Sequence, residues 1–164
     1  MNVGITGHQE LRGGSWEWVD AAIRKEINNF AAEEVVGVSS LAKGADQLFA
    51  RIVVEYGYDL IVVLPMLGYR DRFVDNDDKI GFDLLSRKAS RVEVLESVFR
   101  SDEEAYFEAG KEMVRYSDIV MAVWDGEKAA GLGGTGDVVE YALSVGKMVL
   151  HIEPASESVN LLKP

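Results

Sequence analysis

The stretch IVMAVWDGEKAAGLGGTGDVVEYALSVGKMVLHI, residues Ile119–Ile152, carries the clearest evidence for the fold. It begins with a continuous apolar run, Ile119–Trp124, and ends with a second one, Met148–Ile152. Between them, a glycine-rich loop leads into a segment where apolar residues such as Val138 and Ala142 recur at helical spacing. Continuous apolar strands joined through a helix are typical of a parallel sheet that is covered on both faces.

The same alternation runs through the rest of the chain. Further strands are predicted at Val3–Thr6, Val35–Ser39, Leu60–Leu64 and Val92–Leu95. Helices are predicted at Ser15–Ala31, Ala45–Tyr56, Asp77–Ala89, Ser101–Tyr116 and Gly136–Val145. The sequence therefore predicts an α/β fold with one doubly wound, Rossmann-like, mostly parallel sheet and helices on both faces.

Length and composition indicate a single globular domain. The chain has 164 residues, of which 48% are hydrophobic, and it shows no linker or internal repeat. We therefore expect one Rossmann-like domain over residues 1–164.

The charge balance is strongly acidic. The sequence has 17 Lys and Arg against 28 Asp and Glu, a net charge of −11. Since nucleic-acid binders displace counterions with a positive surface, we expect no nucleic acid and no membrane as a partner. The chain has no cysteine, and its start resembles no signal peptide, so we expect a cytoplasmic location.

Four loops follow predicted strands and would gather at the carboxyl edge of the sheet, where ligands of such folds bind. They are Thr6–Gly14, Ser39–Asp46, Pro65–Phe73 and Asp125–Gly136. These loops hold the cations Arg12, Lys43, Arg70 and Arg72. In an acidic protein, cations at one edge indicate a crevice for an anionic ligand.

The glycine-rich loop is the predicted phosphate site. Gly133, Gly134, Thr135 and Gly136 precede a helix, whose free amides and positive dipole end favour an anion. Glu140 follows in the helix, where it can accept a ribose hydroxyl, act as a catalytic acid or base, or simply be a solvated helix acid. Gly131, Gly133 and Gly136 also spell G-x-G-x-x-G, but the motif does not directly follow a strand, so NAD is rejected as the leading ligand.

Several polar residues in the other loops are further candidates. His8 can contact base or phosphate, or be a turn histidine bonded to backbone, whereas His151 is expected in the core. Asp46 can cap a helix or shape the site, and Asp125 can bind a ribose hydroxyl or a Mg²⁺ ion held by phosphates. Trp124 and Tyr69 can stack on a base. With two His and no Cys, no structural metal site is expected.

Three motifs resemble the SLOG superfamily of Rossmann-like domains, which includes the DNA-processing Smf proteins and the LOG cytokinin-activating enzymes. VGITGH (Val3–His8) is similar to its first strand and turn, and VSSLAKGAD (Val38–Asp46) to the S-G-L-A-x-G-x-D of the Smf members. GGTGDVVE (Gly133–Glu140) resembles the G-G-x-G-T-x-x-E of LOG enzymes. The resemblance covers nearly the whole chain and implies a nucleotide or nucleotide-derived ligand.

The sequence departs from the LOG pattern at the catalytic positions. Tyr106, Ala109 and Gly110 stand where LOG enzymes carry Met, the arginine thought catalytic, and Lys, and Asp137 replaces a Thr. A second similarity, to nucleoside 2-deoxyribosyltransferases over Glu140–Ile152, places their nucleophile near Val138 instead of Glu140. The transfer reaction is therefore the weaker enzymatic interpretation.

Two functions follow from these residues and motifs. The first is a module that binds and senses a nucleotide or ADP-ribose-like ligand. The alternative is a LOG-like nucleoside-monophosphate phosphoribohydrolase, with Glu140 catalytic and Arg70 or Arg72 anchoring phosphate. The residues expected to contact the ligand are Thr6, Gly7, His8, Ser39, Ser40, Lys43, Gly44, Asp46, Arg70, Arg72, Asp125, Gly126, Gly133, Gly134, Thr135, Gly136 and Glu140. A homodimer is expected, and Val19, Ile23 and Ile27 can serve either that dimer or the core. The tail Ser156–Pro164 has no readable role.

Overall fold

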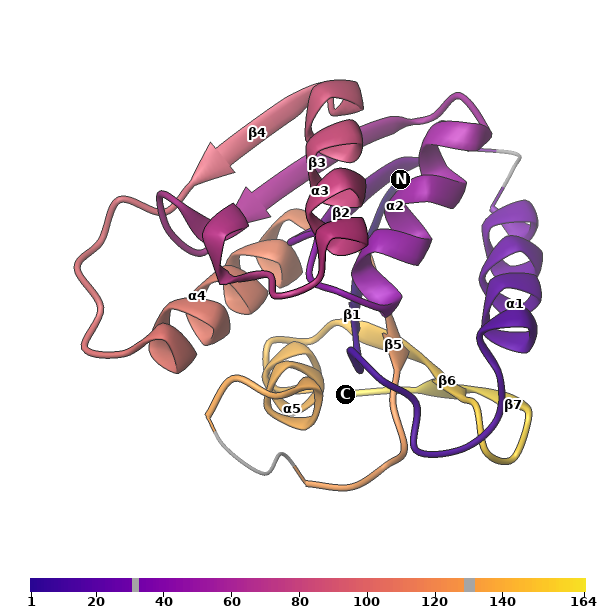
Figure 1. Ribbon diagram of the computed structural model, residues 1–164. Coiled ribbons are helices and arrows are strands. Elements are labelled where there is room, and N and C mark those ends of the chain that lie inside the picture. The colour runs from indigo at the N-terminus through magenta and orange to yellow at the C-terminus, as the bar shows by residue number, and fades with distance from the viewer. Residues whose placement is uncertain (31–32, 129–131) are drawn as a thin grey trace.

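Seven strands form one sheet in the order β4-β3-β2-β1-β5-β6-β7 (Figure 1). The structure is a computed structural model, and it describes residues 1–30, 33–128 and 132–164. The strands are β1 (Asn2–Gly7), β2 (Val36–Ser39), β3 (Asp59–Leu64), β4 (Arg91–Val94), β5 (Ile119–Val123), β6 (Met148–Glu153) and β7 (Ser158–Leu162). All neighbouring strands are parallel except β6 and β7, which are antiparallel. The predicted doubly wound, mostly parallel α/β sheet is confirmed.

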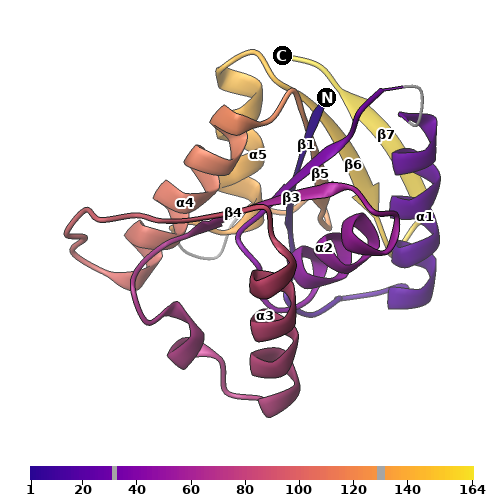
Figure 2. The same ribbon diagram turned by 90° about the horizontal axis from the view of Figure 1, so that it is seen from above.

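Helices cover both faces of this sheet (Figure 2). They are α1 (Trp16–Asn29), α2 (Ala45–Glu55), α3 (Asn76–Lys88), α4 (Asp102–Tyr116) and α5 (Thr135–Ser144), with a short 3₁₀ helix η1 (Tyr69–Arg72). The first three helices lie on one face, and α4 and α5 pack together on the other. Each face has its own core, which centres on residues such as Phe49 on the first face and Met113 on the second.

Two helix starts follow directly from the sequence. The Ser15 hydroxyl accepts a hydrogen bond from the Trp18 amide at 3.2 Å, and the Ser101 hydroxyl accepts one from the Glu104 amide at 3.2 Å. Both serines thus satisfy an amide that the first helical turn leaves free. The observed starts of α1 and α4 agree with the predicted caps.

The structure also resolves questions that the sequence left open. The segment Ser156–Pro164, whose role could not be read from the sequence, contains β7. This strand pairs with β6 in a register that runs from Val149 opposite Leu162 to Glu153 opposite Ser158. Val19, Ile23 and Ile27 of α1 are fully buried, so they serve the core and form no dimer face. The predicted end of the first helix at Ala31, and Gly131 of the glycine loop, lie outside the described residues.

The strand order reverses between β1 and β5. From β1 the chain adds β2, β3 and β4 on one side, then returns through α4 to place β5 on the other side of β1. Such a switch point separates the loops that follow the two central strands and opens a crevice at their carboxyl ends. None of the described helices is both long enough and apolar enough to cross a membrane.

Candidate nucleotide-binding crevice

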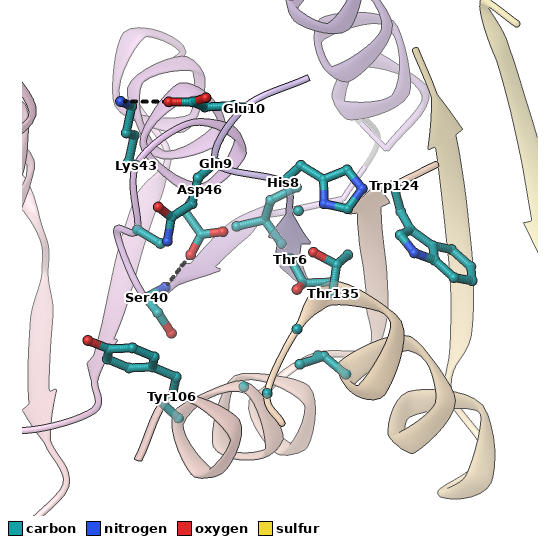
Figure 3. A pocket seen from close by; sticks show the side chains of 18 of the residues that line it. Thr6, His8, Gln9, Glu10, Ser40, Lys43, Asp46, Tyr106, Trp124 and Thr135 are labelled. Atoms are coloured by element: carbon teal, nitrogen blue, oxygen red, sulfur yellow. Dashed lines mark hydrogen bonds and ion pairs between the residues drawn. The ribbon is translucent and has the colours of Figure 1, made fainter. Parts of the chain in front are cut away.

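A cavity of about 540 Å³ lies at this switch point, at the carboxyl edge of the sheet (Figure 3). Its lining comes from the end of β1, the loop from β2 into α2, η1 and the segment after it, the inner face of α4, and the start of α5. Segments far apart in the sequence therefore meet around one space. The volume is in the range of small-molecule sites.

Most of the predicted site residues line this cavity. They are Thr6, Gly7, His8, Ser40, Lys43, Asp46, Arg72, Asp125, Gly133, Gly134, Thr135 and Gly136. Five predicted residues are absent from the lining that the structure describes, namely Ser39, Gly44, Arg70, Gly126 and Glu140. The first four adjoin lining residues in the sequence, whereas Glu140 lies on another face of its helix.

The glycine turn before α5 is held in a fixed shape. Gly133 has a φ of +83°, and a side chain there would approach the Glu103 carbonyl oxygen to 2.7 Å, so only glycine fits against α4. The Gly133 amide donates a hydrogen bond of 2.9 Å to Oδ2 of Asp137, one turn into the helix. The residue that departs from the LOG motif thus closes the turn.

The start of α5 leaves polar groups available to a ligand. Thr135 is only 9% exposed and lines the cavity, and its hydroxyl forms no hydrogen bond with any residue that the structure describes. Figure 3 shows it beside Thr6, at the end of β1. Because Gly134 has no side-chain cap, the first amides of this helix are free to bind an anion.

The wall formed by α4 was not recognised from the sequence. Tyr106, Ala109, Gly110 and Met113 face the cavity at helical spacing. A side chain at Gly110 would approach Cγ2 of Val138 to 2.7 Å, so this glycine lets α4 and α5 lie close together. Where LOG enzymes carry Arg and Lys, Ala109 and Gly110 present small, uncharged groups to the cavity here. The spacing of these residues is the signal that could have identified them as a shared face.

His8 and Asp125 form a pair at the cavity wall. Nε2 of His8 lies 3.1 Å from Oδ1 of Asp125 and 3.3 Å from the Asp125 amide. Burial raises the pKa of Asp125, but hydrogen bonds from the Glu127 amide and His8 outweigh it, so the pKa lies below its usual range. Asp125 therefore stays ionised and orients His8. His8 thus contacts the backbone, as the turn interpretation predicted, and it also lines the cavity.

The cations expected to hold an anion are already paired. Nζ of Lys43 lies 3.0 Å from Asp75 and 3.3 Å from Glu10, and these carboxylates raise its pKa. Arg72 pairs with Asp102 at 3.0 Å. Six acidic and four basic side chains line the cavity, so its walls are not cationic. The backbone amides of α5, not the cations, are the groups suited to a phosphate.

Two predicted roles need correction because of where the side chains lie. Glu140 is exposed and lines a separate shallow depression with Phe107 and Tyr141, outside the crevice lining. Arg70 is not part of the crevice lining and forms a bidentate pair with Asp83, with both N–O distances 2.7 Å. Neither residue is placed to catalyse or to anchor phosphate there.

Asp46 is the most perturbed carboxyl group of the crevice. It is 5% exposed at the start of α2, and its Oδ2 accepts hydrogen bonds from the Ser40 amide at 3.2 Å and from the Ser39 hydroxyl at 3.5 Å. Burial raises the pKa of Asp46 to about 7, although these hydrogen bonds and the Ala42 amide oppose it. Ser39 is fully buried, and the hydrogen bond from its hydroxyl helps to hold this carboxyl group in place.

The two aromatic residues predicted to stack on a base, Tyr69 and Trp124, both pack against other rings of the protein. Tyr69 is 7% exposed and packs edge-on against Tyr106, with ring centroids 5.8 Å apart, so its ring offers no free face to a base. The ring centroids of Trp124 and His151 lie 5.2 Å apart. His151 was predicted to lie in the core, but it is half-buried. Among residues 1–30, 33–128 and 132–164, no three acidic or histidine side chains are grouped as a metal would require.

The chain is therefore a Rossmann-like α/β domain with a cavity at its topological switch point. No protein-family model matches the chain, and no curated protein matches it significantly. Several solved structures are similar in fold. One of them, DNA processing protein A (DprA) from Streptococcus pneumoniae, superposes with a TM-score of 0.63 at 18% identity, over 92% of this chain and 49% of that one.

Two further structures support the same fold. DNA processing protein A from Helicobacter pylori gives a TM-score of 0.65 at 15% identity, over 92% of this chain and 64% of that one. The structural-genomics protein TM1055 gives 0.57 at 14% identity, over 90% of this chain and 71% of that one. The chain thus spans about half of the S. pneumoniae protein. The Rossmann-like fold implied by the sequence motifs is confirmed.

The comparisons contradict one prediction. The H. pylori protein is described by its single-stranded DNA binding mode, so the expectation that a chain of this kind has no nucleic acid as a partner is wrong. The net charge of −11 sums the whole surface, whereas a strand contacts only one groove and stacks on its aromatic side chains. Total charge was therefore too coarse a criterion.

Proposed function

We propose that the crevice binds a nucleotide or nucleotide-derived ligand, with its phosphate at the start of α5, and that the domain acts as a ligand-sensing module. The observation that carries this proposal is the start of α5, where the first helical amides and an accessible Thr135 hydroxyl, which has no hydrogen bond with the described residues, line a cavity at the switch point. These groups can donate hydrogen bonds to phosphate oxygens.

The side chains of the crevice favour binding over hydrolysis. An N-glycosidic hydrolase needs a carboxylate beside the anomeric carbon, and the carboxylate predicted for that role, Glu140, lies outside the cavity. The arginine thought catalytic in LOG enzymes is replaced by Ala109, which offers no charge. We therefore propose that the ligand is held intact. Asp125, which lines the cavity, is the residue that would hold a Mg²⁺ ion carried by the phosphates of the ligand.

Calorimetric titration with AMP and with adenosine tests the proposal. AMP is expected to bind at least about tenfold more tightly than adenosine, since only AMP uses the amides of α5. Thr135→Val keeps the shape of the side chain and removes its hydroxyl, and it should weaken AMP binding by roughly fivefold without affecting adenosine. Ser144→Ala, at the other end of the same helix, is the matched control. Equal affinity for AMP and adenosine would overturn the proposal.

Two further measurements show whether the ligand stays intact and whether it is a free nucleotide or part of a strand. Recovery of intact AMP after incubation, measured by mass spectrometry, supports a binding module, whereas released adenine would make the protein a hydrolase. A short single-stranded oligonucleotide is titrated alongside AMP. Tighter binding of the oligonucleotide would show that the crevice takes a nucleotide unit of a strand instead of a free nucleotide.

A further inference from the structure

The end of the crevice opposite α5 holds two buried polar side chains with unused hydrogen-bonding capacity. Asp46 and Tyr69 are 5% and 7% exposed, and both line the cavity. Burial, and then the charge of Asp46, raise the pKa of the Tyr69 hydroxyl. Neither the carboxyl oxygens of Asp46 nor the Tyr69 hydroxyl is a fully enclosed atom without a partner, so these polar atoms are accessible to a polar ligand in the cavity.

Asp46 and Tyr69 each offer a defined hydrogen-bonding group to a ligand. The hydrogen bonds from the Ser39 hydroxyl and the Ser40 amide both end on Oδ2 of Asp46, and the Ala42 amide is a third donor to the carboxyl group. Since each carboxylate oxygen has two lone pairs, Oδ1 keeps the capacity to accept a hydrogen bond from a ligand. Figure 3 shows the carboxyl group directed into the cavity beyond Ser40. The Tyr69 hydroxyl has no hydrogen bond with the described residues, so it can donate its proton. The end of the cavity thus presents an acceptor next to a donor.

A flat wall accompanies this polar pair. The half-buried ring of Tyr106 lies on α4 against Tyr69 and lines the same cavity. An aromatic ring beside a polar edge is the combination that recognises a nucleobase, since the ring stacks on the face of the base and the polar groups bind its edge.

We propose that Asp46 and Tyr69 form a base-recognition subsite that selects an amino-bearing base, adenine or cytosine, over its oxo counterpart. The inference rests on the proposed function and names the ligand class for the same crevice. Adenine and cytosine present an exocyclic amino donor beside a ring-nitrogen acceptor. Oδ1 of Asp46 accepts from the amino group, and the Tyr69 hydroxyl donates to the ring nitrogen. Hypoxanthine and uracil present a carbonyl oxygen in place of the amino group, which cannot donate to the ionised Asp46, and a ring N–H to which the Tyr69 hydroxyl cannot donate.

Matched ligand pairs test this selection. AMP against IMP, and CMP against UMP, differ at the base edge and share ribose and phosphate. At about pH 8.5, where Asp46 is ionised, the wild-type protein is expected to bind the amino member at least about tenfold more tightly. Equal affinities within both pairs would overturn the subsite while leaving the phosphate-dependent binding of the proposed function intact. Failure of every nucleotide to bind would overturn the proposed function itself.

Two variants assign the selection to named groups. In Asp46→Asn the Ser40 amide requires an acceptor at the Oδ2 position, so the new amide oxygen lies there and its NH₂ group enters the cavity. The AMP-to-IMP affinity ratio should therefore fall at least about tenfold, to equality or past it. Tyr69→Phe keeps the aromatic packing and should lower the same ratio several-fold.

Controls separate recognition from altered folding. Asp59→Asn and Tyr58→Phe make the same chemical changes outside the cavity and should leave the ratio at its wild-type value. The wild-type ratio is a test that needs no variant, so poor folding of Asp46→Asn would not remove it. An unchanged ratio in both folded variants would show that Asp46 and Tyr69 do not read the base.

Discussion

The Gly133 amide donates a 2.9 Å hydrogen bond to Oδ2 of Asp137, and this contact closes the turn that leads into α5. The carboxylate also lies in the first turn of the helix, where the dipole stabilises a negative charge. The turn that presents the amides to the crevice is therefore held by a residue that does not itself line the crevice.

Removal of this contact should loosen the phosphate end of the site. Asp137→Ala is expected to lower the free energy of unfolding by about 1 kcal/mol, because a cap-like hydrogen bond and a favourable dipole contact are lost. Urea unfolding measures the stability, and calorimetry measures AMP affinity, which should fall. Asp137→Asn retains a hydrogen-bond acceptor and should lose less of both. An Ala variant as stable as the wild type would contradict the structural role of this bond.

The close approach of α4 and α5 predicts an unusual response to alanine. Gly110→Ala should gain about 1 kcal/mol of helix propensity, yet its Cβ would meet Val138 at 2.7 Å. We expect the clash to win, with a net destabilisation of roughly 1 to 3 kcal/mol in urea unfolding. The double variant Gly110→Ala with Val138→Ala should recover part of the loss. Stabilisation by Gly110→Ala alone would show that the helices are farther apart.

Asp46 makes stability depend on pH. Burial raises its pKa in the folded state to about 7, above the value of an unfolded aspartate, so the folded state binds more protons between about pH 4 and about pH 7. Its contribution to stability is therefore present below the unfolded pKa and is lost as the pH rises through the folded pKa. The loss is at most roughly 1.4 kcal/mol per pH unit in this window.

Urea unfolding at several pH values measures this dependence. Asp46→Asn, which does not titrate, should flatten the decline relative to the wild type, and Asp59→Asn is the control at an exposed position. A wild-type slope that persists unchanged in Asp46→Asn would assign the effect to other groups.

The exposed residues that the sequence places in the site should be dispensable. Glu140→Gln and Arg70→Ala alter side chains outside the crevice, so each is expected to change AMP affinity by less than about twofold, within the range of ordinary surface substitutions. Arg70→Ala also breaks an exposed ion pair with Asp83, which should cost little stability. A large loss of affinity in either variant would mean that the ligand binds elsewhere.

The strands and helices could be predicted because their periodicity is local. The six parallel strands and five helices all begin and end within two residues of the predicted bounds wherever the structure describes them. β7 was missed because it is an edge strand with polar residues such as Asn160, and its pairing with β6 supplies a stability that its own sequence does not reveal.

The crevice was only partly predictable. Loops at the carboxyl edge could be placed from topology, which is why Thr6, Asp46 and Thr135 line one cavity as expected. Glu140 lies outside the crevice lining because it follows Thr135 by five residues, which places it on another face of α5. The pairing of Lys43 with Asp75 depends on contacts between distant segments, which the sequence alone does not specify.

An amide NMR titration with AMP is the most decisive experiment, because it reports where the ligand lies. We expect the largest shifts at Thr135 and Gly136 of α5 and at Thr6 and Gly7 of β1, and much smaller shifts at α5 with adenosine. Shifts confined to other regions, such as the depression around Glu140 and Tyr141, or no shifts at all with AMP, would contradict the assignment of this crevice as a nucleotide site.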